Sequence, residues 1–225
     1  NEAESIFTSF INDYPKSRFI KNAHIALGLI FRTQGKGQKA LAQFKSVVED
    51  FPNTAESREA LGLAKIQFAE LDQLTSYVDW IQNLTGTDIG QGQLDSTLYH
   101  GAYDRYSFGD CSGTLKGMKE YLDKFPDGIF RVPANYYLAE CAFNQEQDDV
   151  AKIAYEFVAA SGELSFRKHT VERLASLYYA EQNFEKAFYY YEQVLGLVGN
   201  ADEGRRARLG LMRCAKSLGN TAVVM

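Results

Sequence analysis

Proline and cysteine are scarce in this sequence, with 4 and 3 residues respectively among 225. Few prolines leave room for uninterrupted helices, because the proline ring breaks the helical hydrogen-bond ladder. Cys111, Cys141 and Cys214 are odd in number, far apart and in no C-x-x-C spacing, which argues against a cysteine metal site. We therefore interpret the three cysteines as small buried or half-buried residues.

An excess of positive charge and long apolar runs are also missing. The chain has 24 Lys and Arg against 29 Asp and Glu, a formal net charge of -5. Nucleic acid is therefore not an expected partner, because its phosphates require clustered cations. No stretch of about 18 apolar residues occurs, so we expect no direct membrane insertion in this part. The chain begins without Met, inside an expected helix, and we interpret it as a fragment or processed product of a longer protein.

The sequence does contain an internal repeat, which is the first thing to seek in a chain of this kind. The residues around Phe44 and Pro52 repeat those around Phe7 and Pro15 at an offset of 37 residues. The earlier copy reads Ala3, Phe7, Phe10, Tyr14 and Pro15, and the later one reads Ala40, Phe44, Val47, Phe51 and Pro52. Spacings of three and four residues place each set on one face of a helix.

A second signature, a small residue usually preceded by leucine, stands before each such helix. The pairs are Leu27-Gly28, Leu61-Gly62, Gly101-Ala102, Leu138-Ala139, Leu174-Ala175 and Leu209-Gly210. Glycine inside a helix costs about 1 kcal/mol relative to alanine, so a packing requirement must offset it. Two helices about 8–10 Å apart approach this closely only where one side chain is very small. The signature therefore predicts antiparallel helix pairs.

This paired pattern resembles the tetratricopeptide repeat over nearly the whole chain. The resemblance implies an all-α fold, a right-handed superhelical solenoid of antiparallel helix pairs. The endings Tyr14-Pro15 and Phe51-Pro52, each followed by Ser or Thr, further resemble bacterial cell-envelope members, namely the outer-membrane assembly lipoprotein and the Tol-Pal-associated periplasmic protein. That subgroup implies the periplasm or cell envelope, with the cytoplasm as the alternative.

Twelve helices are expected from periodicity and turn residues. Their ranges are 2–14, 18–33, 38–51, 54–70, 72–84, 94–107, 111–125, 130–145, 149–161, 164–181, 184–198 and 202–217. Asp110, Asp148, Asn183 and the Asn53-x-x-Glu56 stretch are expected to cap helices. Residues 85–94 are expected to be an irregular connector between N-terminal repeats in 1–84 and C-terminal repeats in 95–225, with partial repeats at both ends. Uncapped ends of this kind are expected to allow self-association.

In the repeat that the chain resembles, the first helix of each pair lines the concave face. Repeat register gives the partner-binding candidates Tyr99, Tyr103, Tyr106, Tyr136, Glu140, Phe143, Glu172, Ser176 and Tyr179. Tyrosine suits such a groove because its ring is apolar and its hydroxyl forms hydrogen bonds. The alternative interpretation is that these aromatic residues fill the core between repeats.

The function that follows is a non-enzymatic scaffold that binds a protein or peptide partner. His24, His100 and His169 lie in different repeats, and no catalytic, metal or phosphate motif occurs, so no catalytic residue, metal or cofactor is expected. Three alternatives remain open: a glycan or small-ligand site in the aromatic groove, a helper region of a longer enzyme or transport component, and an acidic partner. The last would dock on the arginine-rich stretch 205–216.

Overall fold

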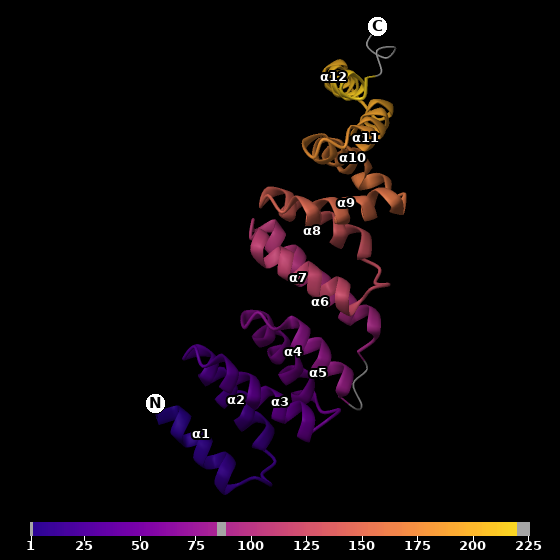
Figure 1. Cartoon of the computed structure of the whole chain (residues 1–225). Helices are drawn as coiled ribbons and strands as arrows, with labels where there is room; N and C mark the ends of the chain where they lie inside the picture. The colour runs from indigo at the N-terminus through magenta and orange to yellow at the C-terminus, as the bar shows by residue number, and fades with distance from the viewer. Residues whose placement is uncertain (1, 85–88, 220–225) are drawn as a thin grey trace. The chain divides into compact units, whose positions relative to one another are not determined.

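The computed structural model describes residues 2–84 and 89–219, and all regular structure within these residues is α-helical (Figure 1). The helices are α1 (Glu2–Asp13), α2 (Ile20–Thr33), α3 (Gly37–Asp50), α4 (Ala55–Glu70), α5 (Leu74–Asn83), α6 (Gln91–Ser107), α7 (Cys111–Lys124), α8 (Arg131–Asn144), α9 (Asp148–Ser161), α10 (Leu164–Ala180), α11 (Phe184–Gly196) and α12 (Ala201–Ser217). The predicted all-α class and helix order are confirmed. None of the helices in the described residues is long and apolar enough to span a bilayer.

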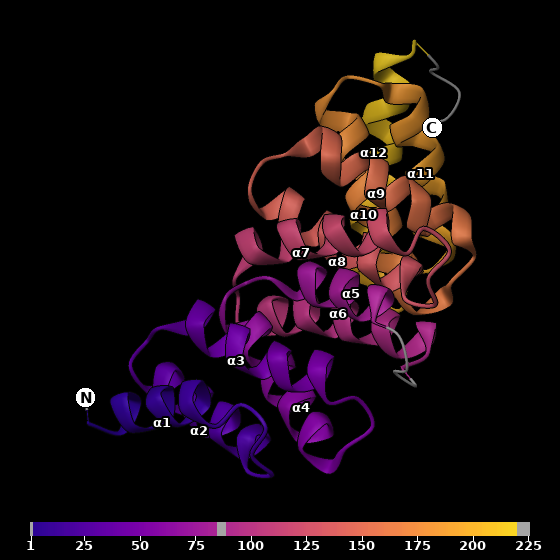
Figure 2. The same cartoon turned by 90° about the horizontal axis from the view of Figure 1, so that it is seen from below.

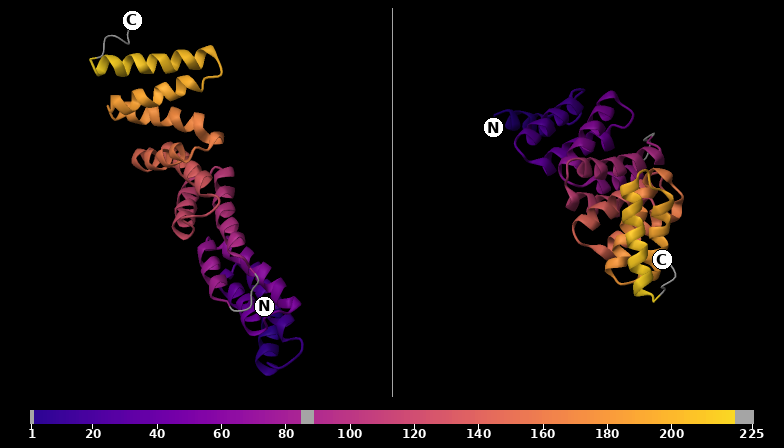
Figure 3. Two further views of the ribbon diagram at one scale, coloured as in Figure 1. Left: turned by 90° about the vertical axis from the view of Figure 1, so that its right-hand side faces the viewer. Right: turned by 90° about the horizontal axis from the view of Figure 1, so that it is seen from above.

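The chain divides into two compact units, Asn1–Gly101 and Ala102–Met225, with the division inside α6. In the first unit, α1 to α5 each pack on the next helix, as α2 and α3 show in Figure 2. In the second unit, α7 to α12 do the same, and α10, α11 and α12 lie side by side in Figure 3. The connector expected at 85–94 lies partly outside the described residues, and α6 already begins at Gln91. The division into repeats at 1–84 and 95–225 stays a prediction.

Small residues bring the helices of a pair together, as the signature predicts. A β-carbon on Gly28 would lie 2.4 Å from the ring of Phe44, which is fully buried in α3. A β-carbon on Gly210 would lie 2.5 Å from the ring of Tyr191 in α11. Gly28 brings α2 onto the second helix of its own pair, as predicted, whereas Gly210 brings α12 onto the second helix of the preceding pair. Each glycine is required by a close approach between two helices.

The repeat register is wrong for α4. Gly62 is exposed, and a β-carbon there would meet nothing within 4 Å. Ser57, Ala60, Ala64 and Gln67 are the buried residues that alternate by three and four along this helix, so Gly62 lies on the opposite face. The sequence pattern predicted Gly62 as the small packing residue of this helix. Ala60 and Ala64, both fully buried, take that place instead.

Two of the four predicted caps are confirmed. The side chains of Asp110 and Asn183 accept hydrogen bonds from the backbone N–H of the third residue beyond each. Asp148 is the first residue of α9 and Gln147 is the N-cap, so the prediction that Asp148 caps this helix is wrong. For α4 the cap is Thr54, which accepts from Ser57 N–H at 3.1 Å, because Asn53 adopts a left-handed backbone with φ 66.

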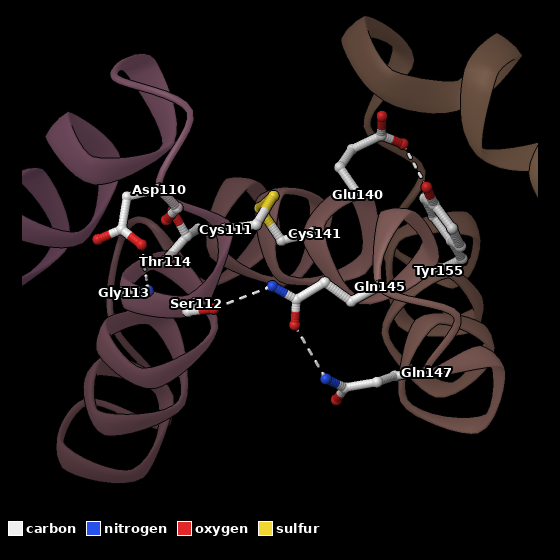
Figure 4. Close-up of a disulfide and its surroundings, with 10 residues drawn as sticks. All are labelled: Asp110, Cys111, Ser112, Gly113, Thr114, Glu140, Cys141, Gln145, Gln147 and Tyr155. Carbon is white, nitrogen blue, oxygen red and sulfur yellow. Dashed lines mark hydrogen bonds between the residues drawn. A yellow bond between two sulfur atoms is a disulfide. The ribbon is translucent and has the colours of Figure 1, made fainter.

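A disulfide between Cys111 and Cys141 joins α7 to α8 (Figure 4). The two Cα atoms lie 5.0 Å apart, although the residues are 30 positions apart in sequence. Cys141 and Cys214 are fully buried and Cys111 is half-buried, as expected, while the pairing itself was not anticipated from spacing. Beside the disulfide, Gln145 donates a hydrogen bond of 3.1 Å to Ser112 Oγ, a second link between the same helices.

Alanine substitutions at Gly28 and Gly62 of the first unit should have opposite effects on its stability. Gly28→Ala should destabilise this unit by about 1–3 kcal/mol, because the new methyl group overpacks against the buried Phe44 ring. Gly62→Ala should stabilise it by about 1 kcal/mol, because an open site gains only helix propensity. Urea unfolding followed by the fluorescence of Trp80, the single tryptophan, reports on this unit. A Gly28→Ala variant as stable as the parent would show that the α2 and α3 packing is misassigned.

Candidate functional site

A continuous group of aromatic rings runs across three first helices of the second unit. We call it the aromatic strip, and its members are Tyr103 and Tyr106 of α6, Tyr136 and Tyr137 of α8, and Phe166 of α10. Tyr137 joins the first two helices, with ring centroids 5.0 Å from Tyr103 and 4.5 Å from Tyr106. Tyr136 joins the last two, since its ring stacks on Phe166 at 4.3 Å.

Every ring of the aromatic strip is half-buried and none is in the core. The core positions of α8 are instead taken by small or aliphatic residues, namely Ala134, Leu138, Ala139, Cys141 and Ala142. Tyr136 and Tyr137 therefore stand beside the packed face of their helix and contact rings of the neighbouring first helices. The strip keeps apolar ring surface and phenol hydroxyls accessible to a partner.

A buried carboxylate lies next to the strip. Glu140 is only 8% exposed and accepts a hydrogen bond from the hydroxyl of Tyr155, whose ring is fully buried (Figure 4). His169 Nε2 lies 3.1 Å from Glu140 Oε1, and Arg173 Nε lies 3.9 Å from the same oxygen. A buried carboxylate requires such partners, because an unpaired charge away from water is costly.

The phenols near Glu140 ionise with difficulty. Burial, reinforced by the negative charge of Glu140, raises the pKa of Tyr106, Tyr136 and Tyr155 above the ordinary value, and the hydrogen bond to Glu140 adds to this for Tyr155. Burial and the neighbouring Tyr103 raise the pKa of Tyr137 to about 12. Tyr106, Tyr136 and Tyr137 therefore present neutral hydroxyls, which both donate and accept hydrogen bonds, at any physiological pH.

Two adjoining pockets continue from the strip along α10, α11 and α12. The first, about 360 Å³, is lined by His169, Glu172, Arg173, Ser176, Tyr191, Val194, Glu203, Arg206 and Ala207. The second, about 280 Å³, is lined by Tyr179, Tyr191, Arg206, Leu209, Gly210 and Arg213. His169 connects them to the strip, since its ring lies 6.2 Å from that of Tyr136.

The predicted partner-binding residues occupy several different places. Tyr103, Tyr106 and Tyr136 lie in the strip, and Glu172, Ser176 and Tyr179 line the two pockets. Glu140 is the buried carboxylate beside the strip, and Phe143 carries the guanidinium of Arg173 over its ring at 4.1 Å. Tyr99 lies in the core of the first unit at 6% exposure, next to the ring of His100. Their role in binding stays a prediction.

Sequence reasoning missed Tyr137, Phe166 and Arg173. The predicted face contained residues at fixed steps from each small residue, and Tyr137 and Arg173 stand one position to the side of it. These two residues are equivalent in the repeat, because they lie 36 residues apart, like Ala139 and Ala175. A wider face, with one more position for each helix, would have included both. Phe166 lies in the first turn of α10, before the repeat signature begins.

The first unit has an apolar hollow between α1 and α2. Its volume is about 410 Å³, and its lining is Ile6, Phe7, Phe10, Phe19, Asn22, Ala23 and Ala26. No residue of α1 is buried, and Ile6 and Phe19 are largely exposed. Self-association through this hollow stays a prediction.

Comparison with known proteins supports the repeat assignment locally. Residues 23–54 match the family model of the tetratricopeptide repeat, a stretch that contains Gly28 and the Phe44 on which it packs. No curated protein sequence matches the chain. The tetratricopeptide repeat is thereby supported in this chain, whereas the cell-envelope subgroup and the binding partner are not addressed by this match.

Several solved structures are similar to this chain at low identity and low TM-score. PilF of Pseudomonas aeruginosa is 17% identical with a TM-score of 0.44, covering 90% of this chain and 86% of PilF. PilW, described as a type IV pilus biogenesis factor, is 15% identical with a TM-score of 0.41, covering 92% and 90%. YrrB, described as a repeat protein with an unusual peptide-binding site, is 14% identical with a TM-score of 0.40, covering 90% and 97%. At these values the similarity says nothing about ligand or activity.

Raised phenol pKa values predict that alkali unfolds the second unit first. Among the described phenols, those with a raised pKa include Tyr106, Tyr136, Tyr137, Tyr155, Tyr178, Tyr190 and Tyr191 in the second unit and Tyr77 in the first. Unfolded tyrosine ionises near pH 10, so the stability from neutral buried phenols is complete below about pH 10. It is lost as pH rises toward about 12, the value reached by Tyr137 and Tyr190.

Tyrosinate absorbance and Trp80 fluorescence, recorded through one alkaline titration, test this order. Absorbance should rise cooperatively while the Trp80 signal of the first unit still has its native value. A gradual rise with the ordinary tyrosine pKa, with no structural change in circular dichroism, would show that these phenols are freely solvated.

Proposed function

We propose that the second unit binds an extended segment of a partner protein along the aromatic strip, and that the protein is a non-enzymatic interaction scaffold. The observation that carries the proposal is the contact of half-buried rings from three successive first helices. Rings that only filled the core would be enclosed, as those of Tyr121 and Tyr155 are. The rings of the strip instead leave apolar area open beside polar hydroxyls.

A surface of this kind suits a peptide for two physical reasons. Tyrosine supplies a large contact area at a small entropic cost, because only two side-chain torsions are fixed on binding. Its hydroxyl also satisfies the backbone N–H or C=O groups of an extended chain, which are costly to bury unpaired. Mutual ring contacts between Tyr103, Tyr106 and Tyr137 hold these side chains in place before the partner arrives.

The buried carboxylate of Glu140 and the imidazole of His169, both beside the strip, fit a packing role within this scaffold. Glu140 and His169 resemble an acid–base pair by residue type, but the contacts of Glu140 go to Tyr155, His169 and Arg173. The guanidinium of Arg173 is in turn held over Phe143. This network fixes α8, α9 and α10 relative to one another and supports the strip from beneath.

Peptides selected from a random phage-displayed library against the chain provide a test of this proposal. Binding should weaken about tenfold or more in a Tyr103→Ala/Tyr106→Ala variant, because aromatic anchors dominate the energetics of such contacts. Affinity is measured by calorimetry with the synthetic peptide, after circular dichroism has shown that the variant is folded.

Tyr189→Ala is the matched control, since this tyrosine is 58% exposed on α11 and outside the strip. It should bind the selected peptide like the parent chain. Equal weakening in both variants, or in neither, would contradict the assignment of the strip. Selection of no peptide, together with specific retention on a glycan array that the double variant loses, would favour the glycan alternative.

We infer in addition that the protein works in an oxidising compartment such as the bacterial periplasm or cell envelope. The disulfide between Cys111 and Cys141 supports this, because reducing conditions in the cytoplasm keep such thiols unpaired. Its position between α7 and α8 also gives it a structural role, since cross-links of this loop length stabilise by about 3–4 kcal/mol in the chain-entropy account.

Thiol trapping in cells that produce the protein tests the compartment. Cells are quenched in acid, and the denatured protein is labelled with a maleimide polymer that adds mass for each free thiol. One label, on Cys214, is expected for the oxidised protein, and labelling after reduction should add two more. Three labels without reduction would place the protein in a reducing compartment. A Cys214→Ala variant, with no label expected before reduction, confirms which thiol is free.

A further inference from the structure

The pocket at the end of the second unit carries two guanidinium groups and no carboxylate. We call it the arginine pocket, and its lining is Tyr179, Tyr191, Arg206, Leu209, Gly210 and Arg213. Tyr179 comes from α10, Tyr191 from α11 and the other four residues from α12. Gly210 lets α12 rest on the ring of Tyr191, which places Arg206 and Arg213 on either side of this contact.

The arginines of this pocket differ from most other cations of the second unit. Lys168 pairs with Glu203 at 2.7 Å and Lys186 with Glu156 at 3.1 Å, and Lys152 pairs with Glu181. On α12 itself, Arg205 pairs with Asp202. Within residues 2–84 and 89–219, by contrast, no carboxylate lies within ion-pair distance of Arg206 or Arg213. The lining of the arginine pocket therefore holds two positive charges and no carboxylate, although Arg206 also borders the neighbouring pocket, which Glu172 and Glu203 line.

The spacing of the two arginines matches an extended acidic peptide. Arg206 and Arg213 are seven positions apart on a continuous helix, which separates them by about 10 Å along its axis. In the polyproline II conformation, an extended form that repeats every three residues, side chains three residues apart lie on one face and about 9 Å apart, whereas in a β-strand they would point to opposite faces. A peptide with acidic residues at that spacing would place one carboxylate on each guanidinium, a geometry that arginine favours for paired hydrogen bonds.

The neighbouring pocket is less selective, because its charges are mixed. Arg173 and Arg206 line that pocket together with Glu172 and Glu203, and Glu203 forms an ion pair with Lys168. The two pockets share Tyr191 and Arg206, so a peptide leaving the strip at His169 meets a balanced region first and the arginine pocket afterwards. Selection for acidic residues would therefore act at the α12 end of the path.

We propose that the arginine pocket binds acidic side chains of the extended peptide that the aromatic strip receives, two carboxylates spaced three residues apart. This inference rests on the proposed function and adds the charge of the partner. The sequence left open an acidic partner on the arginine-rich stretch of α12, and the arginine pocket is where we expect that partner to bind.

Fluorescence anisotropy with three labelled peptides tests the proposal. Each peptide repeats one unit, either Glu-Gly-Tyr, Gln-Gly-Tyr or Lys-Gly-Tyr, so that only the charge at every third position differs. The glutamate peptide should bind at least about tenfold more tightly than the glutamine peptide, and salt should reduce that difference. In an Arg206→Gln/Arg213→Gln variant, the glutamate peptide should bind no better than the glutamine peptide.

The matched control is Arg205→Gln/Arg208→Gln, which removes the same charge from α12 at positions outside the pocket. It should keep the preference for glutamate. Equal loss in both variants would reduce the effect to the overall charge of the helix and overturn the proposal, as would equal binding of the three peptides by the parent chain. Displacement of the glutamate peptide by inorganic phosphate, but not by chloride of equal ionic strength, would reassign the pocket to free anions.

Failure of this inference differs from failure of the proposed function. If all three peptides bind equally and Tyr103→Ala/Tyr106→Ala abolishes that binding, the strip is a peptide site without charge selection. If the glutamate preference disappears only in Arg206→Gln/Arg213→Gln and binding is unaffected by the strip variant, the arginine pocket acts alone.

Discussion

The direct contact between a glycine in one helix and an aromatic ring in a neighbouring helix is the constraint on which the structure depends. Gly28 rests on Phe44 in the first unit, and Gly210 rests on Tyr191 in the second. Dispersion falls off steeply with distance, so a helix held back by one added methyl group loses contact along its whole packed face. Because these contacts fix the distance between helices, they also fix which side chains of neighbouring first helices can meet.

The aromatic strip and the arginine pocket both follow from this spacing. Small residues such as Ala139 and Ala175 are fully buried in the packed faces of α8 and α10, and Tyr136 and Phe166 lie half-buried beside those faces. There Tyr136 and Phe166 reach each other across the gap between first helices. Between α10 and α12 the flanking residues are mostly charged, and the result is a polar path in place of a ring stack. One packing rule therefore yields two surfaces of different chemistry.

Helix order and the contact of Gly28 could be predicted because they depend on local periodicity and on a repeated residue type, whereas the ring under Gly210 belongs to the preceding pair and was not predicted. The Gly62 register could not, because it required knowing that Ala60 and Ala64 bury the other face of α4. The disulfide was also out of reach, since 30 residues is not the repeat length and pairing depends on where α7 and α8 bring their cysteines. At the site, residue types indicated aromatic contacts, whereas the ring partners Tyr137 and Phe166 follow only from three-dimensional packing.

Charge pairing explains why the arginines of α12 are of functional interest in a chain with an overall charge of -5. Elsewhere cations and carboxylates link successive first helices, as Lys21 and Glu56 do at 2.9 Å between α2 and α4 and Lys168 and Glu203 do at 2.7 Å. The cations in these links are already paired with carboxylates of the same chain. Arg206 and Arg213 face a pocket formed with α10 and α11 and keep their charge available. Both arginines are exposed, so salt weakens their attraction for an anionic ligand, but the fold loses no existing ion pair when the ligand binds.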